Sequence, residues 1–371
     1  MAVSFQQIIM YFVGGILIYL AIKKGYEPAL LLPMGFGAIL VNLPQSGALN
    51  QNIGGIGEVK GIVEWLYNVG IETSEALPIL LFIGIGAMID FTPLLTKPSL
   101  FIFGFAAQFG IFAAAGLSLF LGFDFNDAFS IGIIGAADGP TSILVSQILH
   151  SNYMGAITVS AYSYMALVPI IQPLTIKLVT TKKERLIKMI YPTKKIRKST
   201  KILFPIMVTI MAGIVAPMSV GLVGFLMFGN LIRECGVLDN LSKSAQNELT
   251  NLITLLLGIT VSFSMRAEVF VKWETLIILA IGLAAFVFDT IGGIMVAKLM
   301  NLFRKEKINP MIGAAGISAF PISARVIQRL ALEEDPANIL IMHAVGANVA
   351  GQIGSAVIGG CLMNFYFMRM G

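Results

Sequence analysis

The sequence predicts an all-α polytopic membrane protein with two inverted-topology repeats and broken or re-entrant helices at the membrane midplane. The first observation is composition: of 371 residues, 57% are hydrophobic and 12% are charged, and the mean hydropathy is +0.86. These values lie outside the range of soluble domains. The second is that the chain holds 38 glycines, many of them inside apolar runs. The third is that these runs form two sets that resemble each other in order.

Twelve apolar runs can be distinguished, and several are shorter than the about 20 residues that a straight membrane span requires. Because lipid cannot satisfy exposed backbone groups, short and glycine-broken runs indicate helices that line a protected site. The N-terminal sequence MAVSFQQIIM has no positive region, and no cleavage site follows its apolar stretch, so we read it as the start of the first span. The runs occupy residues 8–22, 28–43, 77–89, 99–122, 129–149, 155–179, 202–216, 217–233, 251–263, 275–298, 309–329 and 337–368.

The runs divide into two sets of six, and this division predicts an internal repeat. The segments that resemble each other are 33–44 and 224–236, 77–91 and 252–265, and 135–142 and 313–321. We therefore expect a first membrane repeat at residues 1–180, a basic cytoplasmic linker at 181–201 and a second membrane repeat at 202–371.

Positive charge is concentrated in and beside this linker. Residues 177–201 hold ten Lys or Arg and one acid, whereas residues 44–77 hold four glutamates and one lysine. This asymmetry predicts that the linker is cytoplasmic and that 44–77 lies outside. It also argues against a nucleic-acid partner, because the basic residues do not spread along a face.

A re-entrant hairpin at the fifth run of each half makes this orientation consistent. The loops 90–98, 177–201 and 299–308 then all lie in the cytoplasm, provided that Lys23 and Lys24 do as well. The two halves run through the membrane in opposite directions, as in inverted-repeat transporters. A full span at 129–149 would instead place the basic linker outside.

Asp138, in the segment GAADGPTS, is the most informative residue. An unpaired carboxylate at membrane depth costs at least about 2.5 kcal/mol, so it requires a cation, a proton or a basic partner. Gly135, Gly139 and Pro140 break the helix beside it and free backbone carbonyls. Such oxygens suit small alkali or alkaline-earth ions. The alternative, a cap on a half-helix, is compatible with this interpretation.

The matching segment of the second half is NPMIGAAGISAFPISAR, which contains Asn309, Gly313, Ser318 and Arg325. Polar side chains among small residues permit both close helix packing and ion coordination. Asn309 has an alternative as a cap before Pro310. Arg325 is expected to pair with a carboxylate or bind an anionic substrate, although it could instead extend to the cytoplasmic surface.

Polar residues also interrupt two other apolar segments. Asn348 stands between glycines in the last run and is a candidate sodium ligand or a helix-packing residue, and Ser355 shares its helical face. Tyr162 lies inside the sixth run, where a buried phenol can donate a proton. Asp90 ends its run and is expected to cap a helix facing water. Asp289 lies deeper and serves either the site or a neighbouring helix.

Together the motifs GAADGPTSI, SYMALVPIIQP, NPMIGAAGISAFPISARV and MHAVGANVAGQIGSA resemble the beta subunit of sodium-translocating biotin-dependent decarboxylases. This family comprises the oxaloacetate, methylmalonyl-CoA and glutaconyl-CoA decarboxylases, and the resemblance runs over nearly the whole chain. It implies a carboxybiotin decarboxylase subunit of a primary pump, which exports Na⁺ and takes up a proton.

The resemblance also implies roles for individual residues. It places catalytic roles on Asp138, Tyr162 and Arg325. It places sodium ligation on Asp138, Asn309, Gly313, Ser318 and Asn348.

The resemblance implies partners as well: a carboxyltransferase alpha subunit, a biotin carrier protein and a small gamma or delta membrane subunit. Biotin is expected on a partner, because the chain has no AMKM-type attachment sequence. The expected location is the bacterial inner membrane, as a multi-pass protein, and a homo-oligomer stays open. From the residues alone, a secondary sodium-coupled transporter or Na⁺/H⁺ antiporter is the alternative, since it also needs a midplane carboxylate and broken helices.

Overall fold

The computed structural model describes residues 3–25, 27–55, 57–73, 75–191 and 195–370. Within these ranges the protein is helical apart from one antiparallel hairpin of two short strands, β1 (Gln51–Ile53) and β2 (Gly57–Val59). Seven helices in the described part are long and apolar enough to cross a membrane, or up to nine if two bent pairs each count as one span. This confirms an all-α, multi-pass membrane protein.

The first half of the chain contains the strands and the first ten helices. Its helices are α1 (Phe5–Lys24), α2 (Pro28–Asn42), α3 (Ile62–Tyr67), α4 (Ala76–Met88), α5 (Thr92–Thr96), α6 (Phe101–Ala106), α7 (Phe109–Phe120), α8 (Phe125–Gly132), α9 (Gly139–Ile148) and α10 (Met154–Val179). Shorter turns are η1 (Asn68–Glu72), η2 (Pro98–Leu100) and η3 (Ile133–Ala136). The segment at 44–77 is therefore largely structured.

The linker carries one short helix, and the second half follows it. These helices are α11 (Lys182–Arg185), α12 (Lys198–Val215), α13 (Val220–Cys235), α14 (Asp239–Ser244), α15 (Thr250–Val261), α16 (Ala267–Phe270), α17 (Trp273–Phe303), α18 (Met311–Ala314), α19 (Ile322–Glu334) and α20 (Ile341–Met370). Shorter turns are η4 (Pro217–Ser219), η5 (Ala245–Leu249) and η6 (Ser262–Met265).

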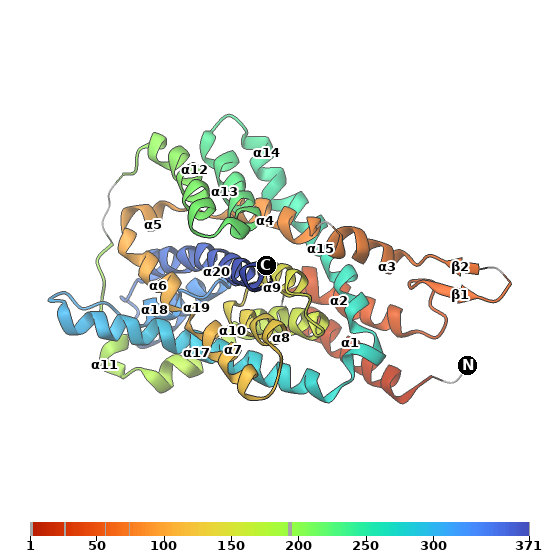
Figure 1. The fold of residues 1–371 in the computed structure, drawn as a ribbon. Coiled ribbons are helices and arrows are strands. Elements are labelled where there is room, and N and C mark those ends of the chain that lie inside the picture. The colour runs from red at the N-terminus through yellow and green to blue at the C-terminus, as the bar shows by residue number, and fades with distance from the viewer. Residues whose placement is uncertain (1–2, 26, 56, 74, 192–194, 371) are drawn as a thin grey trace.

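Helices of the two halves pack against each other throughout the molecule (Figure 1). Helix α2 contacts α15 while α4 contacts α13, and α10 contacts α17 while α6 contacts α20. Glycine permits the closest of these approaches: a Cβ at Gly86 would meet the backbone of Leu226, and one at Gly229 would meet the backbone of Ile83. The halves therefore share one core.

The three loops predicted to be cytoplasmic, at 90–98, 177–201 and 299–308, lie at one end of the molecule, near α5, α11 and the C-terminal end of α17, and the β-hairpin lies at the opposite end (Figure 1). Ion pairs connect these loops. The ammonium nitrogen of Lys298 lies 3.0 Å from a carboxylate oxygen of Glu184, and that of Lys201 lies 3.9 Å from one of Asp90. The geometry thus groups the three loops as the charge pattern requires.

Candidate functional site

Two interrupted helices meet at the centre of the structure. In the first half, the chain passes from η3 through Ala137, in the left-handed region at φ 52°, to Asp138 and into α9. In the second half, residues 315–321 separate α18 from α19. The backbone N–H of Ser318 donates a hydrogen bond to the carbonyl of Ala136 at 3.1 Å. The two breaks therefore satisfy each other's backbone at a depth where lipid offers no partner.

Asp138 is the N-cap of α9 and is 4% exposed. One carboxylate oxygen, Oδ2, accepts hydrogen bonds from the Thr141 hydroxyl at 2.7 Å and from the Ser355 hydroxyl at 2.9 Å. The backbone N–H of Thr141 reaches Oδ1 at 3.4 Å. Within the described residues no ion pair involves this carboxylate. Asp138 thus caps its half-helix, and the remaining lone pairs of its carboxylate are free to coordinate a cation, so the cap does not exclude the ion-binding role predicted from the sequence.

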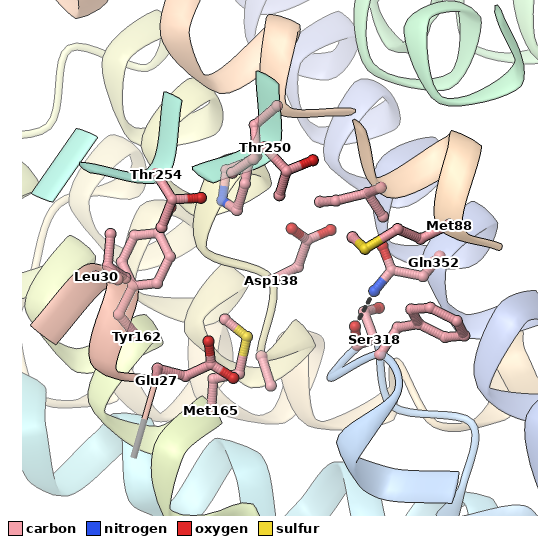
Figure 2. A pocket seen from close by; sticks show the side chains of 15 residues that line it. Glu27, Leu30, Met88, Asp138, Tyr162, Met165, Thr250, Thr254, Ser318 and Gln352 are labelled. Atoms are coloured by element: carbon pink, nitrogen blue, oxygen red, sulfur yellow. Dashed lines mark hydrogen bonds between the residues drawn. The ribbon is translucent and has the colours of Figure 1, made fainter. Parts of the chain in front are cut away.

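A cavity of about 140 Å³ lies beside Asp138. Figure 2 shows Asp138 between Glu27 and Tyr162 on one side and Ser318 and Gln352 on the other. The hydroxyl of Tyr162 is buried and has no hydrogen-bond partner in the described part of the chain. The residues that line the cavity are Glu27, Leu30, Leu81, Ile85, Met88, Ala137, Asp138, Pro140, Tyr162, Met165, Thr250, Thr254, Ser318, Phe320 and Gln352. They include two carboxylates and no Lys, Arg or His.

One face of α20 holds the second break in place. Asn348 donates from its amide to the carbonyl of Ile317 at 2.6 Å, and Gln352 donates to the carbonyl of Ser318. The Ser318 hydroxyl donates to the carbonyl of Gly351 at 2.8 Å. The side-chain oxygens of Asn348 and Gln352 are buried and have no partner. Both are neutral oxygen ligands of the type that hard cations prefer.

Asn309 and Gly313 lie outside this cavity. The Asn309 amide donates to the carbonyls of Arg185 and Ile187 at 2.8 and 2.9 Å, and its oxygen accepts from the backbone N–H of Met311 at 3.1 Å. Asn309 therefore caps α18, the alternative considered from the sequence, and fastens the linker. A Cβ at Gly313 would meet the backbone of Gly293 in α17, so this glycine permits close helix packing.

Arg325 lies in the first turns of α19 with an exposed side chain. It has no hydrogen-bond or ion-pair partner in the part of the chain that the structure describes. The predicted pairing with a carboxylate is therefore not present among these residues. Arg329, one turn further on, donates to the carbonyl of Pro169 at 3.2 Å and lies 3.8 Å from a carboxylate oxygen of Glu333. Of these two described arginines, Arg325 is the one whose guanidinium has no partner.

Asp90 and Asp289, the other two aspartates considered from the sequence, each accept a hydrogen bond from a backbone N–H. Asp90 lies one position before Phe91, the N-cap of α5, and accepts from the backbone N–H of Thr92, the first residue of that helix, at 2.9 Å. It also lies near Lys201 at a polar end of the molecule. Asp289 is fully buried in α17, and its Oδ1 accepts from the backbone N–H of Gly110 in the first turn of α7, whereas its Oδ2 has no partner among the described residues. It does not line the cavity.

Two residues of the cavity were not identified as site residues from the sequence. Gln352 could have been found, because Asn348, Gln352 and Ser355 follow at spacings of four and three and so share one helical face. Glu27 stands between two apolar runs in KKGYEP, where an acidic residue among basic ones resembles an ordinary loop. Only the packed structure places it beside Asp138.

Known proteins resemble this chain over nearly its whole length. The family described as Na⁺-transporting oxaloacetate decarboxylase beta subunit matches residues 6–366. The chain is 46% identical over 384 residues to the methylmalonyl-CoA decarboxylase subunit beta of Propionigenium modestum, covering 97% of this chain and 94% of the relative. It is 44% identical over 362 residues to the glutaconyl-CoA decarboxylase subunit beta of Acidaminococcus fermentans, covering 98% and 94%. It is 41% identical over 412 residues to the oxaloacetate decarboxylase beta chain of Klebsiella pneumoniae, covering 97% and 95%.

Proposed function

Because the chain belongs to the family of beta subunits of Na⁺-transporting decarboxylases, we propose that it decarboxylates carboxybiotin delivered by a partner chain and couples this step to Na⁺ export with proton uptake. Members of this family are subunits of primary sodium pumps. The comparisons give no support to the alternative of a secondary transporter or antiporter.

The observation that carries this proposal is the position of Asp138, a buried carboxylate where two broken helices meet. It lines a cavity with an apolar wall and no basic side chain. A sodium ion at this carboxylate would offset its charge, and the oxygens of Ser318 and Asn348 lie on the segments packed around it. We assign Na⁺ to Asp138, Ser318 and Asn348. Asn348 does not line the cavity, but its side-chain oxygen has no partner among the described residues. The roles of Asn309 and Gly313 as ligands stay predictions, since the Asn309 amide binds the linker and Gly313 packs against α17.

The chemistry requires that the N–C bond of the carboxybiotin carbamate breaks, that CO₂ leaves and that the ring nitrogen takes one proton. Arg325, exposed and without a partner, is positioned to bind the carboxylate of this substrate. Tyr162 lines the cavity together with Asp138, its hydroxyl is buried, and it is the proposed proton donor. Loss of the negative carboxylate changes the charge near the cavity and so biases the side to which the ion site opens.

We propose that residues 1–180 and 202–371 are inverted repeats joined by the linker 181–201. Reciprocal packing supports this: α2 with α15 matches α13 with α4, and α10 with α17 matches α20 with α6. A short π-helical turn also precedes each of the matching helices α4 and α15, although η5 runs directly into α15 whereas η1 ends four residues before α4.

The complex is expected to include a carboxyltransferase alpha subunit, a biotin carrier protein and a gamma or delta membrane subunit, in a bacterial inner membrane. The end that carries α5, α11 and the C-terminal end of α17 is the proposed receiving side for the carrier, because its basic residues are typical of cytoplasmic loops. The carboxyltransferase, and not this chain, would choose the acyl substrate.

The test is sodium-22 uptake into inverted vesicles that hold this chain with its co-purifying partners. Uptake is started with oxaloacetate or a candidate acyl-CoA and repeated with avidin, which sequesters biotin. We expect uptake that needs the acid and stops with avidin. Uptake driven only by an imposed proton or anion gradient and indifferent to avidin would instead establish a transporter.

A further inference from the structure

Glu27 places a second carboxylate on the cavity that holds Asp138 (Figure 2). It is half-buried and belongs to the connection between α1 and α2. An acidic residue at a helix N-cap ordinarily accepts a hydrogen bond from the first-turn N–H groups. Glu27 occupies this position in α2 but makes no such bond, and its backbone lies in the left-handed region at φ 36° and ψ 57°. Capping therefore does not account for this side chain.

No basic group offsets the charge of Glu27. In the described ranges of the chain its carboxylate has neither a hydrogen bond nor an ion pair. The lining of the cavity contains no Lys, Arg or His, and much of its wall is apolar, with Leu30, Leu81 and Phe320 among the residues that form it. Two carboxylates facing one cavity of low polarity favour a cation between them.

Two further groups independently indicate a ligand. Tyr162, which is 3% exposed, and Gln352, which is 4% exposed, both line the cavity. The hydroxyl of Tyr162 and the side-chain oxygen of Gln352 have no partner among the residues that the structure describes. Buried polar atoms are almost always hydrogen-bonded, so unpaired oxygens around one cavity mark a place that a ligand fills. Both unpaired atoms are oxygens, the ligand type that hard cations such as Na⁺ prefer.

We propose that Glu27 is the capture carboxylate for sodium, the group that the ion meets first on its way to Asp138. Glu27 is half-buried whereas Asp138 is 4% exposed, so the two carboxylates lie at different depths. Glu27 sets the sodium concentration at which the pump works, and the decarboxylation step itself is left to Asp138, Tyr162 and Arg325. This inference rests on the proposed function.

The experiment compares Glu27→Gln with Glu75→Gln in the reconstituted complex. Glu75 is a matched control because it is also a half-buried N-cap residue, of α4, with a left-handed backbone at φ 52° and no capping bond, but it does not line the cavity. Carboxybiotin decarboxylation is measured against sodium concentration, with choline keeping the ionic strength constant. We expect Glu27→Gln to raise the half-saturating sodium concentration about tenfold, with excess sodium restoring the rate. Glu75→Gln should leave it unchanged.

A third variant, Glu27→Asp, keeps the charge and should stay within about threefold of the wild type, a shift much smaller than that expected from loss of the charge. Equal half-saturating sodium in Glu27→Gln and the wild type would overturn the inference, as would a loss of rate that excess sodium does not restore in a variant with wild-type thermal stability. If the wild-type complex shows no sodium-dependent decarboxylation, the proposed function itself fails, and this outcome is seen before any variant is compared.

Discussion

The N–H of Ser318 and the carbonyl of Ala136 form a 3.1 Å hydrogen bond that joins the turns of two interrupted helices from opposite halves of the chain. Each turn alone would leave backbone groups without partners inside the membrane. The two turns bind each other, and the amides of Asn348 and Gln352 donate hydrogen bonds to carbonyls of the second turn. Asp138 lies two residues after Ala136 and is therefore held next to this junction. The predictions below test what this junction does.

Asp138→Asn should abolish sodium-dependent decarboxylation and sodium uptake. The amide keeps an oxygen that can accept from Thr141 and Ser355, so the fold is expected to survive. A unit charge pair about 4 Å apart attracts by about 4 kcal/mol at the effective dielectric of a protein, roughly a thousandfold in affinity. Sodium-22 uptake and carboxybiotin turnover check this, and retained pumping would remove Asp138 from the ion site.

Tyr162→Phe should raise thermal stability while lowering activity. The hydroxyl is buried without a partner, and such a group costs about 1–3 kcal/mol, which the phenyl ring avoids. If the hydroxyl supplies the proton, turnover should fall at least about a hundredfold. Thermal unfolding in detergent and turnover are measured on the same preparation. A stabilised variant with full activity would show that the proton comes from another group.

Gly139→Ala should damage the site by displacing Tyr162. A Cβ at residue 139 would meet the tyrosine ring, and one at Gly116, in α7, would meet nothing within 4 Å. Overpacking of this kind costs about 1–3 kcal/mol. We expect turnover to fall at least about tenfold for Gly139→Ala, since a tenfold change corresponds to about 1.4 kcal/mol, which lies within this range. Gly116→Ala is the control, and a similar loss in both variants would point to general sensitivity of the helices.

Asn309→Ala should release the linker. The carbonyl of Ile187 would lose this donor, and the carbonyl of Arg185 would keep only the Asn338 amide at 3.0 Å, at a cost of about 1–3 kcal/mol. Trypsin should then cut the basic linker faster than in the wild type, because local opening becomes more frequent. Asn247→Ala, at an exposed asparagine, is the control. A shift in half-saturating sodium without faster cleavage would instead favour the ligand role predicted from the sequence.

Arg325→Ala should remove substrate binding without lowering stability. The side chain is exposed and has no partner among the described residues, so its loss breaks no contact of the fold. A hydrogen bond to a charged group contributes about 1.5–3 kcal/mol, so kcat/KM for carboxybiotin should fall roughly tenfold to a hundredfold. Arg329→Ala is the matched control. Equal effects of the two substitutions would indicate a general role of surface charge.

Sequence patterns predicted the membrane class, both helix breaks and four of the residues gathered around the junction: Asp138, Ser318, Asn348 and Tyr162. The membrane class could be predicted because a high apolar content indicates a chain surrounded by lipid. The helix breaks could be predicted because glycine and proline next to a polar residue are typical of an interrupted helix. Within α20, helical periodicity also places Ser355 on the face of Asn348.

The directions of side chains outside regular helices could not be predicted. Glu27 lies in a left-handed turn and Asn309 precedes a short helix, so no period relates either side chain to a face. The surroundings of both side chains depend on packing between segments that are distant in the sequence. Glu27 lines the cavity, and Asn309 binds the linker.

The hydrogen bond between Ser355 and Asp138 spans 217 positions of the chain. During synthesis, α9 is made long before α20, so the Asp138 carboxylate lacks the hydrogen bond from Ser355 until α20 has been made. The proposed ion site is therefore complete only when the second half has been inserted and has packed against the first, so we expect it to form late in the synthesis and folding of the chain.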